Sequence, residues 1–162
     1  MQVPPVNLIL SNMNKLIFSL AAAVLAPIAM AEDAAKVELT GNDAMQFSSK
    51  AFEVTAGQSV SLTFKHIGQL PKTAMGHNVV ILKAGTAIPA FATKAMTAKD
   101  TDYIPADAES KALIIAHTKT IGGGESDTIT FTAPTEAGSY PFLCTFPGHF
   151  AVMQGVMTVK AK

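Results

Sequence analysis

The chain of 162 residues contains no arginine and no tryptophan, and its only cysteine is Cys144. Nucleic-acid-binding proteins usually carry a basic, arginine-bearing face, so that class is not expected. One cysteine excludes an intramolecular disulfide framework and any four-cysteine zinc or iron–sulfur site. Charged residues make up only 15% of the chain and hydrophobic residues 49%, which argues against a disordered chain. The 11 glycines and 9 prolines follow no period, which excludes a collagen-like structure.

Part of the apolar excess lies in a segment near the N-terminus. Lys15 is the only charged residue before Glu32, and it is followed by an apolar run at 16–26. The run is shorter than the ~20 apolar residues of a membrane span. Ala29-Met30-Ala31 has the small-x-small form of a signal-peptidase site. We therefore predict that residues 1–31 are a signal peptide.

Two further expectations concern where the signal peptide begins and whether it is cleaved. Met13-Asn14-Lys15 is a more usual beginning for a signal peptide than Met1, so residues 1–12 are interpreted as an upstream extension or a misassigned start. The alternative to cleavage is an uncleaved N-terminal anchor. Cleavage would leave residues 32–162, a length typical of one domain with one core. An exported protein with a lone free thiol draws attention to Cys144, because such a thiol is a liability unless it is buried or bound to a metal.

The remaining chain shows short alternating runs separated by turn residues, a pattern that indicates an all-β sandwich or barrel. In the clearest run, residues 58–65, Val60, Leu62 and Phe64 alternate with polar residues. The other predicted strands are 36–40, 45–54, 78–82, 113–116, 127–131, 140–144 and 155–160.

One stretch, residues 84–112, does not follow the strand pattern. Residues 89–96 are rich in alanine and begin with proline, which is typical of a helix with proline in its first turn. Residues 100–107 are rich in aspartate and are predicted to form a loop. We expect this stretch to be a short helical flap inserted between two strands.

A motif that can bind a metal follows the apolar strand 140–143. Cys144, His149 and Met153 form a C-x4-H-x3-M pattern, and Pro147-Gly148 between them favours a tight loop. Thiolate, imidazole and thioether are soft donors, which select copper over calcium, magnesium or manganese. The pattern therefore predicts a copper site at the end of this strand.

A second imidazole is available upstream, at the start of the predicted strand 78–82. His77 lies there in Gly76-His77-Asn78, and the ends of an early and a late strand can meet in a sandwich. Two histidines, one cysteine and a weak axial methionine are the ligand set of electron-transfer blue-copper sites. A nucleophilic Cys–His dyad is the alternative, but the apolar surroundings offer no evident oxyanion hole. Zinc could use the same donors, although zinc sites seldom use thioether.

These motifs resemble the azurins, which are periplasmic blue-copper proteins of the cupredoxin family. The resemblance covers nearly the whole chain after residue 31. It is carried by Gly41-Asn42-Asp43-Ala44-Met45-Gln46-Phe47, Leu70-Pro71-Lys72-Thr73-Ala74-Met75-Gly76-His77-Asn78, Ile115-Ala116-His117-Thr118-Lys119 and Cys144-Thr145-Phe146-Pro147-Gly148-His149.

The resemblance implies an eight-stranded Greek-key β-sandwich and one copper ion, cycling between Cu(I) and Cu(II), per chain. The ligands would be His77, Cys144 and His149, with Met153 and the Gly76 carbonyl as weak axial partners. Asn78 would tie the two ligand loops together, and Phe146 would pack beside the site.

The implied function is that of a periplasmic one-electron carrier that is not itself an enzyme. A copper storage or delivery protein is the alternative function. We expect a monomer that exchanges electrons with c-type cytochromes and periplasmic reductases. These partners would dock at an apolar patch around Met75, Pro147 and His149.

Two further histidines are not expected to bind the metal. His66 continues the inward face of the strand 58–65, so it is predicted to be a packed core histidine. The resemblance places it near the copper, buried and responsive to pH. His117 lies between an apolar strand and Thr118-Lys119, and we predict a surface position for it.

Overall fold

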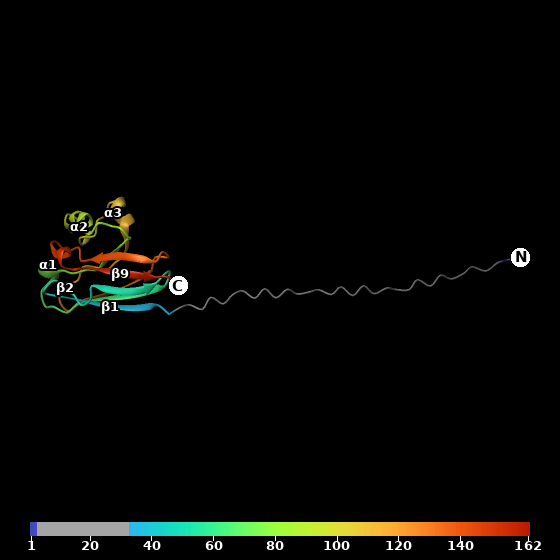
Figure 1. Cartoon of the computed structure of the whole chain (residues 1–162), viewed down its shortest axis with the longest axis horizontal. Coiled ribbons are helices and arrows are strands. Elements are labelled where there is room, and N and C mark those ends of the chain that lie inside the picture. The colour runs from blue at the N-terminus through green and yellow to red at the C-terminus, as the bar shows by residue number, and fades with distance from the viewer. Residues whose placement is uncertain (3–32) are drawn as a thin grey trace. The chain divides into compact units, whose positions relative to one another are not determined.

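The computed structural model describes residues 1–2 and 33–162 of the chain. The predicted signal peptide, residues 1–31, lies outside the described residues apart from its first two. From residue 33 onwards, two β-sheets stack face to face and short helices lie on one side of them (Figure 1). The prediction of an all-β sandwich with a helical insertion is therefore confirmed.

The first sheet has four strands. They are, in spatial order, β2 (Gln46–Phe47), β1 (Ala35–Asn42), β4 (Ser59–His66) and β7 (Ser126–Thr132). β1 runs parallel to β4, and β4 runs antiparallel to β7. β2 pairs with the end of β1 through Gly41 and Asn42.

The second sheet has five strands, one of which leads directly to the predicted metal ligands. In spatial order they are β3 (Ala51–Thr55), β9 (Gln154–Lys160), β8 (Gly138–Leu143), β5 (Val80–Leu82) and β6 (Ile114–His117). β8 lies between β9 and β5 and is antiparallel to both. Cys144 follows directly after this central strand, so its backbone is positioned by neighbours on two sides.

The hydrophobic core fills the space between the two sheets. Val60, Leu62 and Phe64 of β4 are fully buried, while the residues between them face outward, as the alternating pattern predicts. From the opposite sheet, Phe142 packs against Phe47 with ring centroids 5.6 Å apart. Burying these side chains supplies most of the driving force for joining the sheets.

The predicted strand 45–54 is divided between the two sheets, so the described residues form nine strands where eight were expected. β2 pairs with β1 in the first sheet, whereas β3 pairs in parallel with β9 in the second. The Asn42 side-chain oxygen accepts hydrogen bonds from the backbone N–H groups of Ala44 and Gln46, and Met45 has a left-handed φ of 56°. This tight turn leads into β2, and the polar residues 48–50 cross from one sheet to the other.

The flap between β5 and β6 contains α2 (Ile88–Met96), a 3-10 turn η1 (Lys99–Thr101) and α3 (Ala108–Leu113). The predicted helix 89–96 is confirmed, with proline in its first turn. The Asp107 side chain accepts a hydrogen bond from the backbone N–H of Ser110 and caps α3. α3 continues through Leu113, so β6 begins one residue later than predicted.

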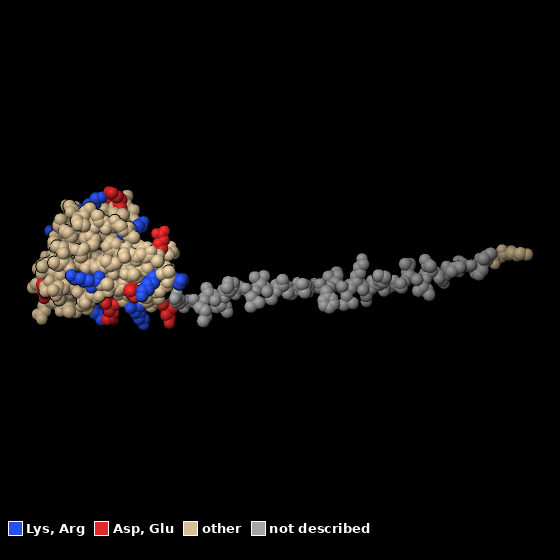
Figure 2. All heavy atoms as spheres, viewed as in Figure 1, with Lys and Arg blue, Asp and Glu red and all other residues tan. Residues whose placement is uncertain are grey.

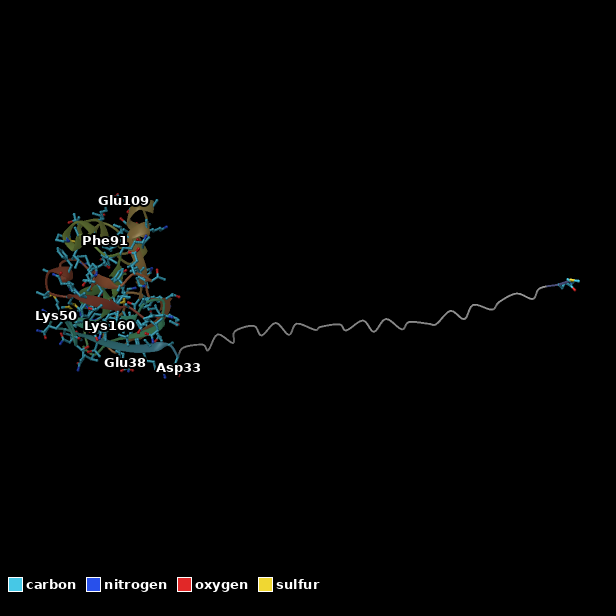
Figure 3. All side chains as sticks on the ribbon, turned by 45° about the vertical axis from the view of Figure 1, so that its right-hand side comes forward. Asp33, Glu38, Lys50, Phe91, Glu109 and Lys160 are labelled. Carbon is cyan, nitrogen blue, oxygen red and sulfur yellow. The ribbon has the colours of Figure 1, made fainter. Side chains whose placement is uncertain are left out.

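The flap covers the outer face of the second sheet (Figure 1), and Figure 3 labels Phe91 and Glu109 on its two helices. Phe91 and Ala92 of α2 form a buried cluster with Val80, Leu82 and Leu143, and Phe150 packs against that cluster. The flap therefore braces both β8 and the segment that follows Cys144. None of the helices in residues 33–162 is long and apolar enough to cross a membrane.

Candidate metal centre

His77, Cys144 and His149 meet at one end of the sandwich. His77 follows the short helix α1 (Lys72–Met75), Cys144 follows β8, and His149 begins the 3-10 turn η2 (His149–Ala151). Their exposed fractions are 0%, 0% and 4%. Figure 1 shows α1 at the end of the domain opposite the C-terminus. The structure thus brings together three residues that the sequence separates by up to 72 positions.

The donor atoms of these three residues form a compact triangle. The Nδ1 atoms of His77 and His149 lie 3.1 Å apart, and the Cys144 Sγ lies 3.8 Å and 3.7 Å from them. Three atoms at these separations surround a point about 2 Å from each, close to the lengths of metal–imidazole and metal–thiolate bonds in proteins. The geometry therefore fits a single metal ion held by two nitrogens and one sulfur.

The orientation of the His77 ring is set by its other nitrogen. Its Nε2 lies 2.9 Å from the Asn42 carbonyl oxygen, and a carbonyl can only accept a hydrogen bond. The proton is therefore on Nε2, and Nδ1 presents a lone pair toward the sulfur. Fixing the tautomer in this way is how proteins prepare a histidine for a metal.

Backbone hydrogen bonds close the loop that carries Cys144 and His149. The Cys144 N–H donates to the Met153 carbonyl at 2.9 Å, and the Met153 N–H donates to the His149 carbonyl at 2.8 Å. Gly148, which precedes η2, has a φ of 83°, a conformation that glycine adopts without a Cβ clash. The loop can therefore turn back and place the His149 ring against the sulfur.

Of the two predicted axial partners, Gly76 is located by its carbonyl oxygen and Met153 by its backbone. The Gly76 carbonyl oxygen is 4.0 Å from the Cys144 sulfur. A Cβ on Gly76 would come within 2.8 Å of both Phe146 and Thr120, so glycine allows this close approach. Met153 is fully buried in the same hydrophobic cluster as Cys144, and its backbone is tied to both Cys144 and His149.

Asn78 joins the two ligand-bearing segments. Its side-chain amide donates to the Thr145 hydroxyl at 2.7 Å, and its side-chain oxygen accepts from the Thr145 N–H at 2.8 Å. Both residues are buried, so water does not compete for these bonds. Phe146 packs beside the site, with its ring centroid 4.8 Å from that of His149. The roles expected for Asn78 and Phe146 are confirmed.

Burial controls the charge of the site. It raises the pKa of the Cys144 thiol to about 12, an effect partly opposed by the backbone N–H groups of Asn78 and Phe146, which point at the sulfur. Burial also lowers the pKa of His149 to about 4, and the neighbouring His77 and His66 lower it further. The pKa of His77 is lowered as well, chiefly by burial. Without metal, the two imidazoles are therefore neutral lone-pair donors at neutral pH.

His66 and His117 lie where the sequence predicts. His66 is 1% exposed and stacks on His77 with ring centroids 4.4 Å apart. Its Nε2 donates to the Met75 carbonyl at 2.8 Å, and its Nδ1 accepts from the Gly68 N–H at 3.0 Å. Both nitrogens are engaged, so His66 supports the site without belonging to the donor triangle. His117 is exposed.

Sequence reasoning missed two buried threonines near the site. The Thr118 hydroxyl accepts from the Val79 N–H at 2.9 Å, and the Thr120 hydroxyl accepts from the Asn78 amide at 3.2 Å. Their exposed fractions are 0% and 3%. A run such as Thr118-Lys119-Thr120 carries no signal of burial, because the partners that satisfy the hydroxyls are distant in the sequence.

Comparison with known proteins identifies the family. Residues 33–160 match the family model described as copper binding proteins, plastocyanin/azurin family. The chain is 43% identical over 128 residues to an azurin from Alcaligenes faecalis, covering 76% of this chain and 97% of that protein. It is 39% identical over 145 residues to an azurin from Pseudomonas aeruginosa, covering 88% and 95%.

A solved structure agrees with this assignment. The reduced auracyanin of Roseiflexus castenholzii superposes with a TM-score of 0.69 at 39% identity, covering 80% of this chain and 99% of that one. The chain therefore belongs to the plastocyanin/azurin family of copper-binding proteins, and its fold is the cupredoxin sandwich. The cofactor is copper, and the donor triangle fits one type 1 copper ion.

The buried histidines predict how the stability of the metal-free protein depends on pH. In the unfolded chain His149 titrates near 6.5, whereas in the folded chain its pKa is about 4. As the pH falls through this window, the unfolded state binds the proton first. The free energy of unfolding should therefore decrease by up to a few kcal/mol between these two values, with His77 acting in the same direction.

Urea unfolding of the metal-free protein between neutral pH and about pH 4 would measure this decrease. His149→Gln should flatten the curve, whereas His117→Gln, at an exposed histidine, should leave it unchanged. A His149→Gln curve as steep as that of the wild-type protein would contradict the assignment.

Proposed function

We propose that the protein is a periplasmic one-electron carrier in which His77, Cys144 and His149 hold the copper. Met153 and the Gly76 carbonyl are the weak axial partners in this proposal. The observation that carries it is the buried triangle of two imidazole nitrogens and one sulfur. Bound copper supplies reversible one-electron chemistry by alternating between Cu(I) and Cu(II). The donor set is complete without an open position for a substrate, so we do not expect an enzyme.

A copper storage or delivery protein is the second candidate function. Such a protein should present accessible, flexible ligands that release the metal easily. Here the ligands are buried. The Asn42 carbonyl holds the His77 ring, and Asn78 and Met153 hold the backbone on either side of the Cys144–Thr145 peptide bond. A rigid site changes little when the charge of the metal changes, which favours electron transfer over delivery.

The surface around His149 offers a place for a redox partner. Pro147 and Gly148 are exposed, and Met75 is half-buried near the other ligand. Leu70 and Met96 are exposed large apolar residues, with exposed fractions of 41% and 38%. Exposed apolar surface on a monomer commonly marks a contact site. We propose that c-type cytochromes and periplasmic reductases dock here, as close to the copper as the fold allows.

Charge should contribute little to finding these partners. On the face that Figure 2 shows, lysines and acidic residues are scattered among uncharged residues without a block of one sign. The chain has 12 basic and 12 acidic residues, and removal of residues 1–31 would take away only Lys15, leaving a net charge of −1. Steering over long distances needs a larger field than this.

The essential ligand should be Cys144, because only a thiolate gives the intense blue charge-transfer band of a type 1 site. Cys144→Ser should abolish the band even if copper still binds, as judged by visible absorption and metal analysis. Met153→Ala should keep the colour and shift the reduction potential, because an axial thioether tunes the metal rather than holding it. A Cys144→Ser protein that stayed fully blue would disprove the site.

The docking proposal predicts that charges near His149 slow electron exchange. Met75→Lys or Met96→Glu should reduce the exchange rate with a c-type cytochrome, measured by stopped flow, while colour and potential stay nearly unchanged. Ser139→Lys is the matched control. Ser139 is exposed near the start of β8, whereas Cys144 follows the other end of that strand. If all three variants exchanged electrons at the wild-type rate, the docking surface would lie elsewhere.

We also propose that residues 1–31 direct export and are removed. Expression of the full chain in a Gram-negative host should then yield a periplasmic protein whose N-terminus is Glu32. Mass spectrometry of the intact protein from the periplasmic fraction measures this. Recovery of a membrane-bound chain that retains residues 16–26 would support the uncleaved anchor instead.

A further inference from the structure

Two consecutive residues of the flap have an unusual backbone conformation. Asp102 has φ 54° and ψ 35°, and Tyr103 has φ 62°. Aspartate tolerates the left-handed region, but a bulky aromatic residue rarely adopts it. Such conformations persist only where the surrounding contacts over-determine them, and they cluster at functional sites. The contacts of these two residues therefore show what the turn holds in place.

Asp102 is fixed to the scaffold of the metal centre through its backbone. Its carbonyl oxygen accepts a hydrogen bond at 2.9 Å from the hydroxyl of Thr120, the residue whose oxygen also accepts from the Asn78 amide. Its carboxylate lies 2.8 Å from the Lys72 ammonium, but both side chains are about half exposed, so this ion pair contributes little. The partly buried carbonyl–hydroxyl bond ties the turn to Thr120, and the N–H groups of Asp102 and Tyr103 donate to the Lys99 and Ala98 carbonyls within the flap.

The Tyr103 side chain extends from this turn to Phe146, the residue that packs on the His149 ring. Its ring meets Phe146 edge to face, with centroids 5.2 Å apart and an interplanar angle of 68°. Phe146 in turn packs on the His149 ring at 4.8 Å. Edge-to-face pairs at such distances are attractive and directional. The three rings form a row that connects a strained turn of the flap to one member of the donor triangle.

We propose that Tyr103 is a positioning residue for His149, acting through Phe146. In the loop 145–152 that carries His149, Asn78 holds Thr145, and the cluster beneath α2 holds Phe150. The Phe146 side chain follows the first of these two anchors. The Phe146 side chain is half-buried, so it needs a neighbour on its outer side to hold its orientation. Tyr103 supplies that neighbour, and the strained backbone of Asp102–Tyr103 is the conformation that aims the ring at Phe146.

The test uses the metal-free protein, so it does not depend on copper. Tyr103→Asn removes the ring and keeps a residue that tolerates the left-handed backbone, and Tyr103→Leu is a second version. The His149 N–H, which donates to the Phe146 carbonyl, should exchange with solvent about three- to tenfold faster than in the wild-type protein, the effect of losing one aromatic pair. The Leu62 N–H in β4 should change less. Tyr103→Phe keeps the ring and should restore the wild-type exchange rate at His149.

A merely structural role for Tyr103 would give a different result. General destabilisation would raise the exchange rates at His149 and Leu62 together. We expect that result for the control Tyr140→Leu, because the Tyr140 hydroxyl donates to the Glu136 carbonyl outside the site. That parallel rise in the Tyr103→Asn or Tyr103→Leu protein, or no rise at all, would overturn the proposal.

A second reading comes from the copper-loaded protein, and its meaning rests on the proposed function. The Cu(II) hyperfine splitting in the EPR spectrum should shift in Tyr103→Asn and not in Tyr103→Phe. If wild-type protein showed no type 1 spectrum, the proposed function would fail while the exchange result stood. If the spectrum were type 1 but the exchange at His149 were unaltered, only the positioning role would fail.

Discussion

Burial of three donor atoms within a few ångströms of one another is the constraint on which the rest of the structure depends. The two imidazole nitrogens lie 3.1 Å apart beside the sulfur, and burial lowers the pKa of both histidines, so both rings are neutral at neutral pH. Contacts outside the triangle hold its three members in place. The Asn42 carbonyl orients the His77 ring, and Asn78 joins the segment that carries His77 to Thr145. Backbone hydrogen bonds to Met153 close the loop that carries His149.

The fold places these contacts where strands end. β8 is held between β9 and β5, and it releases the chain at Cys144. The flap covers the outer face of the same sheet and reaches the ligand loop through Phe91 and Phe150 on one side and Tyr103 on the other. A site assembled in this way is set before the metal arrives. That property suits a carrier, because little has to move when the copper gains or loses an electron.

Much of this arrangement could be predicted from the sequence. The alternation in β4 indicated a sandwich, and the cysteine motif with an upstream Gly-His-Asn predicted that His77, Cys144 and His149 meet. These features are local patterns or depend on a ligand set that few sites share. The division of residues 45–54 between two sheets was not predictable, because an alternating run does not show which partner each half will find.

The supporting network was also out of reach of the sequence. Thr120 and Tyr103 are each separated from their partners by tens of residues, and their burial or ring contacts exist only after the sheets have packed. Threonine is mostly found on protein surfaces, and tyrosine is intermediate between surface and core. The residue type alone therefore does not show that either side chain supports a buried site. The predicted ligands could be found because their chemistry is rare, whereas the residues that hold them are chemically ordinary.

We propose that the buried triangle holds a copper ion that gains and loses one electron without leaving the protein. Voltammetry of the copper-loaded protein, with metal analysis before and after repeated cycles, tests this proposal. We expect a reversible one-electron wave and one copper ion per chain throughout. Irreversible waves with progressive loss of copper from the reduced protein would contradict it and would favour storage or delivery.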